Sequence, residues 1–171
     1  NETVVLLDVS EEVEKQRRLE LERDYDQLTE LYNRGAFRKN TESLLDSGTL
    51  SCAAMVMWDL DNLKYVNDTY GHEMGDRYIK LFADQLKQLV ALGAIVERHS
   101  GDEFMAFLCG ENEEQIRTEI QKFFAAARNV ALKVDEDYEL PLRASAGITW
   151  YPRQARDFLT LSRYADFAMY M

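Results

Sequence analysis

Acidic side chains stand at two places where the sequence predicts that a β-strand ends. Asp59 directly follows the apolar run Ala53–Trp58, and Asp102 and Glu103 occupy a short polar turn further along the chain. A continuous apolar run is typical of a strand buried on both faces, and ligands commonly bind at the sheet edge where such strands end. If the two segments pair, these carboxylates converge. Carboxylate oxygens completed by waters and substrate phosphates suit Mg²⁺ or Mn²⁺, so the pattern predicts a metal site.

The stretch Ala94–Gly110 predicts a β-hairpin around the second acidic group. Its apolar runs flank the residues Ser-Gly-Asp-Glu at 100–103, and a Gly-Asp pair between β-like runs is a strong hairpin signal. The glycine lets the backbone approach a bound group closely. A carboxylate in a hairpin turn is usually only solvated, so Asp102 becomes a metal-ligand candidate through the wider pattern rather than by itself.

That wider pattern resembles a known family. Residues 100–104, Ser-Gly-Asp-Glu-Phe, are similar to the signature of the GGDEF family, the diguanylate cyclases, with serine in place of the first glycine. The resemblance covers the chain from about Asp26 to its end. The other matching segments, in chain order, are Asp26-x-Leu28-Thr29-x-Leu31-x-Asn33-Arg34 with Phe37, Asp59-Leu60-Asp61-x-x-Lys64-x-x-Asn67-Asp68, Gly71-His72-x-x-Gly75-Asp76, Arg98, Ser145-x-Gly147-Ile148 and Ala165-Asp166-x-Ala168-Met169-Tyr170.

The resemblance implies a reaction and a metal site. A GGDEF domain condenses two GTP molecules into cyclic di-GMP and releases two pyrophosphates, and metal ions assist such nucleotidyl transfer. Asp59 and Asp102 match the carboxylate metal ligands, and Leu60 matches a ligand through its carbonyl. Asp102 also matches the residue that helps to deprotonate the 3′-hydroxyl. Glu103 is the neighbouring catalytic acid, in a metal or polar support role.

Seven positions match residues that bind the substrate. Asn67 and Asp76 match the positions that hydrogen-bond guanine, whose N–H donors suit a carboxylate. Taken alone, both are equally typical of turn and N-cap residues, and His72 of a structural histidine. The resemblance also implies phosphate contact by Lys64. The full set is Leu28, Lys64, Asn67, His72, Asp76, Ser100 and Gly101.

Four departures from the family pattern leave parts of this function open. Ser100 stands where the family has glycine, and its small side chain is either tolerated there or crowds the nucleotide. Ala91 and Ala94 stand where the family's inhibitory product site needs Arg-x-x-Asp, so we expect no product inhibition there. Asn62 replaces a common aromatic residue. The sequence ends at Met171, before the segment from which the family supplies basic phosphate-binding residues.

Hydrophobic periodicity predicts the elements that hold these residues. Their order is typical of an α+β fold, a sheet with helices on one side, similar to the ferredoxin-like palm of nucleotide cyclases and polymerases, and the resemblance implies the same fold. Strands are expected at 50–59 and 142–150 beside the hairpin, and helices in two pieces over 28–45 and at 76–92, 113–131 and 158–171.

The first 25 residues predict a connection to another domain. Thr3–Leu7 is typical of a short strand, and Glu11–Tyr25 of a charged helix with few apolar residues. The start resembles the end of a PAS-type sensor domain, with a plain strand before a helix as the alternative. The expected division is 1–10 for the sensor, 11–25 for a linker and 26–171 for a GGDEF domain without its extreme C-terminal segment. The linker either pairs two chains or is a solvated helix.

Composition bounds the partners. The net charge of −11 argues against a nucleic-acid surface, since such surfaces carry clustered Lys and Arg. No apolar run approaches about 18 residues, so no membrane contact is expected from this segment. Cys52 and Cys109 are expected as buried thiols in a reducing, cytoplasmic setting. Whether the parent protein is membrane-anchored stays open.

Three functions fit the sequence to different degrees. A diguanylate cyclase in a signalling protein, with GTP as substrate and a homodimer for catalysis, accounts for the whole ordered pattern. A catalytically silent domain that binds GTP or a partner protein accounts for the serine and the missing basic segment. Another palm-type cyclase or polymerase accounts for the metal carboxylates but not for Asn67, His72 and Asp76.

Overall fold

A four-stranded antiparallel sheet occupies the centre of the structure, a computed structural model that describes residues 2–171, with side chains from residue 9 onward. Its strands lie in the order β2 (Ile95–Ser100), β3 (Glu103–Gly110), β1 (Cys52–Leu60) and β6 (Ala144–Tyr151). The predicted hairpin is therefore confirmed as β2 and β3. Strand β1 pairs with β3 on one side and β6 on the other, so its exit lies in the interior of the sheet.

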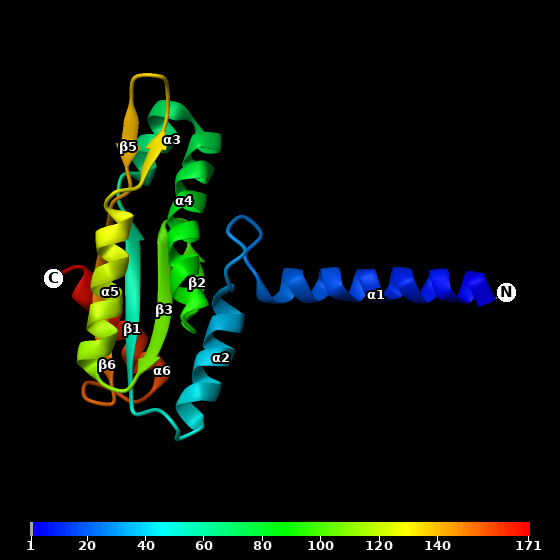
Figure 1. Ribbon diagram of the computed structural model, residues 1–171, viewed down its shortest axis with the longest axis horizontal. Coiled ribbons are helices and arrows are strands. Elements are labelled where there is room, and N and C mark those ends of the chain that lie inside the picture. The colour runs from blue at the N-terminus through cyan, green and yellow to red at the C-terminus, as the bar shows by residue number, and fades with distance from the viewer. Residues whose placement is uncertain (1) are drawn as a thin grey trace.

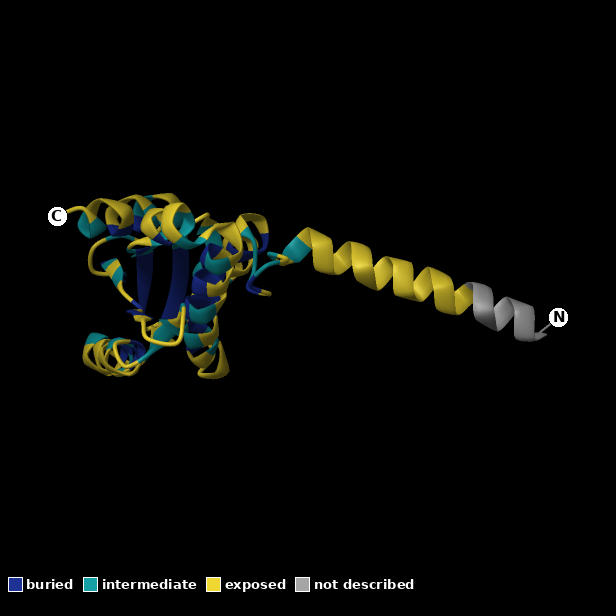
Figure 2. Ribbon diagram, turned by 90° about the horizontal axis from the view of Figure 1, so that it is seen from above, coloured by how far each residue is buried: buried dark blue, intermediate teal, exposed yellow. Residues whose placement is uncertain are grey.

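Helices cover both faces of this sheet, as Figure 2 shows from above. On one face, α4 (His72–Ala91) and α5 (Glu113–Ala127) pack on alternate residues of β1, among them Trp58. On the other, α2 (Arg34–Asp46) and α6 (Phe158–Met169) pack on the remaining β1 residues. The prediction of helices on one side is wrong. Because every β1 residue from 52 to 58 is apolar, both faces need a cover.

Local sequence explains where several helices begin. Asn33 caps α2 by accepting the Ala36 N–H at 3.0 Å, and Asn112 caps α5 by accepting the Gln115 N–H at 2.9 Å. Gly71, at φ +90°, separates α3 (Leu63–Tyr70) from α4. Two consecutive helices thus follow β1, and Figure 1 shows α3 beyond the end of the sheet and α4 running back alongside it.

Other predictions needed correction. The stretch 28–45 contains one helix, α2, because residues 26–32 form a turn. The short pair β4 (Ala131–Lys133) and β5 (Glu139–Pro141), and helix α3, were not predicted. Cys52 is buried as expected, but Cys109 is exposed, close to the end of β3.

At the N-terminus a single helix, α1 (Glu2–Asp24), points away from the sheet (Figure 1). The strand predicted at 3–7 is wrong: no Gly or Pro interrupts residues 2–24, and a short apolar run fits either element. The assignment of 1–10 to a sensor domain stays a prediction. Val13, Leu19 and Leu21 on α1 are about half exposed. In the described part of the chain, no helix has the length and apolar character of a membrane span.

Candidate active site

The two acidic groups meet at the end of β1. Asp59 lies opposite Glu103 in the β1–β3 register, and the Leu60 N–H donates to the Asp102 carbonyl oxygen at 2.7 Å. This strand pairing is what brings the four residues together. The structure thus places the candidate metal and catalytic residues side by side.

The carboxylates of this cluster repel one another. The pKa of Asp59 is raised to about 6, first by burial and then by the carboxylates of Asp102, Glu103 and Asp61. Burial and like charges both disfavour the ionised form of a carboxyl group. A bound cation would remove that penalty, so the electrostatics of this strand end favour one.

Hydrogen bonds hold the turn between β2 and β3 on both sides. Ser100 Oγ donates to Glu103 Oε2 at 3.1 Å, so the serine turns toward the acidic cluster. The Arg98 guanidinium donates to the Gly101 carbonyl oxygen from Nη2 at 3.1 Å, and its Nη1 lies 3.4 Å from Asp26 Oδ1. A Cβ added at Gly101 would meet nothing within 4 Å. Packing within the protein therefore does not require this glycine.

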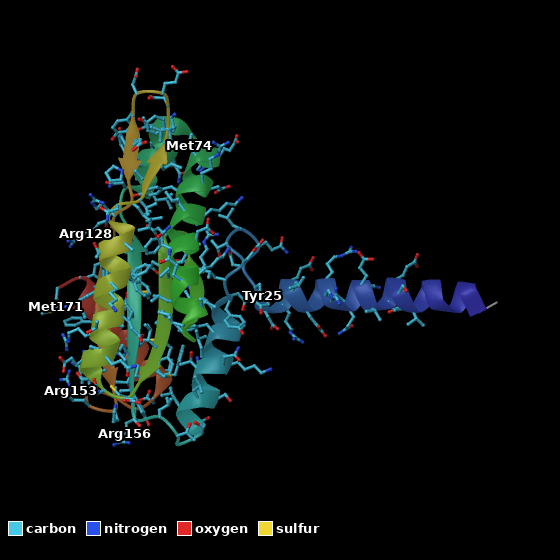
Figure 3. All side chains as sticks on the ribbon, in the orientation of Figure 1. Tyr25, Met74, Arg128, Arg153, Arg156 and Met171 are labelled. Carbon is cyan, nitrogen blue, oxygen red and sulfur yellow. The ribbon has the colours of Figure 1, made fainter. Side chains whose placement is uncertain are left out.

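Through its ion pair with Arg98, Asp26 connects this turn to the first residues of the domain. Its Oδ2 accepts the Thr29 N–H at 2.9 Å and the Thr29 hydroxyl at 2.8 Å, which closes the turn that carries Leu28. Leu28 packs, partly buried, against the core. Tyr25, labelled in Figure 3 where α1 meets the domain, stacks on Tyr32 at 5.0 Å between ring centroids.

The remaining candidates lie on α3 and the first turns of α4. The Asn67 side chain packs directly on Gly75, at a place that a Cβ on Gly75 would occupy. Because Asp76 directly follows Gly75, this contact brings Asn67 close to Asp76. Lys64, His72 and Asp76 are exposed.

Comparison with known proteins decides the family. The sequence matches the family described as "Diguanylate cyclase, GGDEF domain" over residues 23–171.

The chain belongs to the GGDEF family. Its relatives include the biofilm architecture maintenance protein MbaA of Vibrio cholerae, 34% identical over 156 residues, and the probable diguanylate cyclase DgcE of Escherichia coli, 31% identical over 169 residues. They also include the cyclic di-GMP phosphodiesterase PdeR of Escherichia coli, 27% identical over 163 residues. The matches cover 85%, 98% and 95% of this chain but only 19%, 15% and 24% of the respective relatives.

Solved GGDEF domains have the same fold. A sensory box/GGDEF family protein from Caulobacter crescentus superposes with a TM-score of 0.75 at 28% identity, covering 86% of this chain and 96% of that one. The GGDEF domain of PA1120 from Pseudomonas aeruginosa gives a TM-score of 0.76 at 26% identity, covering 85% and 86%. The predicted palm-type α+β fold is therefore confirmed.

The donor set of this GGDEF domain fits a small hard cation. Asp59 and Asp102 offer carboxylate oxygens, and Leu60 adds a backbone carbonyl beside them. Among the described residues, no three side chains of Asp, Glu, His or Cys form a metal-holding group. A metal at this strand end would therefore take its other ligands from backbone, water and substrate oxygens.

Two residues near the carboxylates had no role assigned from the sequence. Ser145 Oγ donates to Asp61 Oδ1 at 3.1 Å, beside the metal candidates. The pKa of Tyr170, at the C-terminal end of α6, is raised by partial burial and then by the charges of Glu103 and Asp59, so this residue lies within electrostatic reach of the same acidic cluster. Both belong to segments that resemble the family motifs, so the sequence marked them without showing what they contact.

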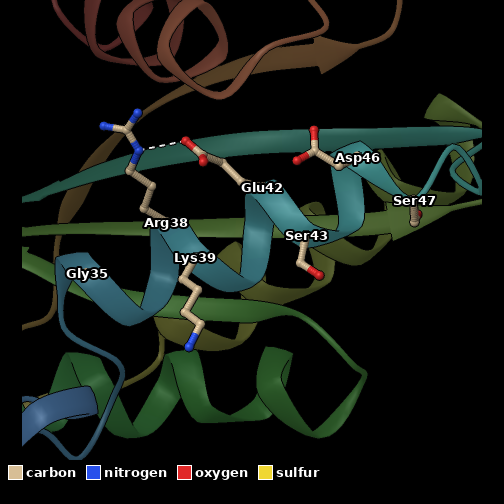
Figure 4. Close-up of a pocket in the computed structure, with 7 residues that line it drawn as sticks. All are labelled: Gly35, Arg38, Lys39, Glu42, Ser43, Asp46 and Ser47. Carbon is tan, nitrogen blue, oxygen red and sulfur yellow. Dashed lines mark hydrogen bonds and ion pairs between the residues drawn. The ribbon is translucent and has the colours of Figure 1, made fainter.

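Two surface hollows beside α2 are not lined by these residues. Figure 4 shows one of about 800 Å³ along the outer side of α2, where Arg38 and Glu42 form an ion pair at 2.6 Å. None of the candidate site residues lines it. The candidate site is identified by its strand pairing and charges rather than by cavity volume.

Proposed function

We propose that this GGDEF domain is a diguanylate cyclase that condenses two GTP molecules into cyclic di-GMP. The observation that carries the proposal is the strand-end cluster, where burial and then the neighbouring Asp102 carboxylate raise the pKa of Asp59 to about 6. The DgcE relative, named a probable diguanylate cyclase, supports the same reaction.

The strand end supplies the catalytic half of the site. Asp59, Asp102 and the Leu60 carbonyl hold Mg²⁺ or Mn²⁺, and Glu103 supports them, with its carboxylate held by Ser100. When bound, the metal lowers the pKa of the attacking 3′-hydroxyl and balances the charge of the leaving group. Asp102 accepts the hydroxyl proton. The 3′-oxygen bonds to the α-phosphorus of the second GTP, and the bond to pyrophosphate breaks.

The helices supply the half that recognises GTP. Asp76 accepts hydrogen bonds from the guanine N1–H and N2–H groups. Asn67, whose side chain packs on Gly75, donates to an acceptor on the edge of the base. An adenine lacks those adjacent donors, so GTP is preferred to ATP. Lys64, near the start of α3, contacts the phosphates in this proposal, as the family resemblance implies. Leu28, His72, Ser100 and Gly101 complete the surface against which the nucleotide lies.

Catalysis needs a second copy of the domain. Each domain holds one GTP, and the two must face each other for both 3′-hydroxyls to react. We assign the pairing of two chains to helix α1, because the family resemblance implies a linker helix with that role, and pairing raises the effective concentration of the two domains. The rate per molecule therefore rises with protein concentration, and a rate that is constant over a wide dilution series would contradict this requirement.

A catalytically silent, nucleotide-binding domain is the second candidate. Ser100 occupies the turn with its hydroxyl on Glu103, which engages a carboxylate of the cluster. The PdeR relative, named a phosphodiesterase, also shows that matching chains occur in proteins with a different named activity. The alternative differs in one respect that can be measured, since such a domain binds GTP without forming product.

The first experiment is mass-spectrometric detection of cyclic di-GMP after incubation with GTP and Mg²⁺, on a chain extended through its natural C-terminus. Asp102→Ala tests the strand-end cluster. Asp84→Ala is the matched control, because Asp84 is an exposed carboxylate on α4 with 63% of its side chain accessible. We expect product from the wild type and the control and none from Asp102→Ala. Bound GTP without product, even at high protein concentration, would establish the silent domain instead.

A further inference from the structure

The side chain of Tyr78 is completely buried, yet its hydroxyl bonds twice to one stretch of backbone. Tyr78 has no accessible surface. Its hydroxyl donates to the Pro141 carbonyl oxygen at 3.1 Å and accepts the Arg143 N–H at 3.3 Å. Inside a protein, an unpaired polar group is costly, so a phenol used as both donor and acceptor fixes its partners closely. Residues 141–143 are thereby held to helix α4.

The same stretch of backbone continues to the end of β1. The Arg143 carbonyl oxygen accepts the Asp61 N–H at 2.9 Å. Asp61 directly follows Leu60, whose own N–H is bonded to the Asp102 carbonyl oxygen at 2.7 Å. A short, continuous series of hydrogen bonds therefore connects the Tyr78 hydroxyl with the backbone that carries the candidate metal ligands.

On its own helix, Tyr78 lies beside the part that faces the base. Asp76 is two residues earlier, and Gly75, on which Asn67 packs, is three residues earlier. Figure 3 locates this part of α4 by the label on Met74. One helical turn thus carries both a candidate guanine ligand and the hydroxyl that reaches the strand end.

Residues 141–143 are also held by hydrogen bonds to the end of α5 and to the residues that follow it. Arg143 Nη1 donates to the Arg128 carbonyl oxygen at 3.3 Å, at the end of α5 that Figure 3 labels. The Leu142 N–H donates to the Val130 carbonyl oxygen at 2.9 Å. With the segment fixed from this side, the Tyr78 hydroxyl supplies the hydrogen bonds that join it to α4 among the described residues, beside the packing of Leu142 in the same core.

We infer that Tyr78 is a positioning residue whose hydroxyl sets the base-binding turn of α4 against the metal-binding end of β1. The inference rests on the proposed function, which assigns those roles to the two halves. The inference predicts that removing the hydroxyl leaves each half of the site intact. What changes is the placement of the two halves relative to each other, and so the binding of a nucleotide that contacts both. The loss therefore falls on the part of the binding that depends on the metal.

The test is Tyr78→Phe, which keeps the buried ring and removes only the hydroxyl. Tyr164→Phe is the matched control, since Tyr164 is 51% exposed on α6. The probe is 3′-deoxy-GTP, which lacks the attacking hydroxyl, and its affinity is measured by calorimetry in EDTA and in saturating Mg²⁺. For Tyr78→Phe we expect the same affinity for the probe in EDTA as for the wild type and the control. The increase in affinity that Mg²⁺ produces should be about fivefold smaller in Tyr78→Phe, which corresponds to the usual contribution of one hydrogen bond.

Equal weakening in both buffers would show a merely structural residue, and no weakening in either would show that the hydroxyl positions nothing; each overturns the inference. Should Tyr78→Phe be too unstable to titrate, hydrogen exchange of the Asp61 amide gives a second reading in the free protein. Faster exchange at Asp61 than in Tyr164→Phe supports the inference, and equal exchange overturns it. A wild type that binds the probe with Mg²⁺ but forms no cyclic di-GMP overturns only the cyclase proposal.

Discussion

The two halves of the candidate site are built in different ways. The carboxylate half lies on paired strands, where Asp59 faces Glu103 and backbone hydrogen bonds fix the spacing. The base-recognition half lies on two short helical segments, where Asn67 is placed by contact with Gly75 and most other candidates are exposed. Many backbone hydrogen bonds together fix the sheet register, whereas the helical half presents individual side chains on the surface of α3 and α4. Changes in the first half should alter chemistry, and changes in the second should alter affinity.

The largest effect is expected from Asp59→Asn. The substitution removes a candidate metal ligand and the charge it supplies, so cyclic di-GMP formation should fall roughly 10³-fold. Stability should move the other way. The pKa of Asp59 in the folded domain, about 6, lies above its ordinary value of 3.8, so ionisation of Asp59 costs folding free energy as the pH rises through this window.

Without metal, the free energy of unfolding of Asp59→Asn at pH 7 should therefore exceed that of the wild type by about 1 kcal/mol after allowance for solvent screening, so the variant should unfold at a higher temperature. The advantage should shrink toward pH 4, where the wild-type carboxyl is protonated in the folded state. Thermal unfolding in EDTA at several pH values measures it. An Asn variant less stable than the wild type at pH 7 would show that the carboxylates do not repel each other in this way.

The carboxylate half was also the half that the sequence predicted best. A Gly-Asp turn between β-like runs and an apolar strand that ends in Asp59 are local patterns, and their pairing follows from a hairpin placed beside a buried strand. The unbroken apolar run of β1 from residue 52 to 58 also indicated a second layer of helices, which the predicted one-sided arrangement overlooked. Burial on both faces requires covers on both.

The helical half and its connections were harder to predict for physical reasons. Helix α3 is eight residues long with Val66 as its one buried residue, too short for periodicity to show. Tyr78 was not singled out from the sequence, because a sequence pattern can indicate burial but not the hydrogen-bond partners of a hydroxyl. At 3–7, the apolar run lacked the breaker residues that separate a strand from a helix.

The second prediction tests the contact between the Asn67 side chain and Gly75 in the helical half. Gly75→Ala places a Cβ where the Asn67 side chain lies, and that flexible side chain must turn away. The loss of its hydrogen bonding to guanine should raise the KM for GTP about tenfold and leave kcat nearly unchanged. Gly35→Ala is the control, since its Cβ would lie at an ordinary 3.7 Å from Asn33 Oδ1. A fall in kcat with constant KM would mean that Asn67 acts on the chemistry instead.

The smallest effect is expected from Ser100→Gly, at the border between the two halves. The change restores the family's first glycine and removes the hydrogen bond from Ser100 Oγ to Glu103 Oε2. An exposed hydrogen bond of this kind contributes little, and its removal frees the Glu103 carboxylate and the space beside Gly101, so kcat/KM should rise about threefold. Ser100→Ala separates the two causes: it frees the carboxylate but keeps a Cβ in the turn. If steady-state kinetics show that alanine matches glycine, the hydroxyl restrains the site; if alanine matches serine, crowding by the Cβ does. A loss of activity in Ser100→Gly would instead mean that this chain uses its serine to hold Glu103 in the active arrangement.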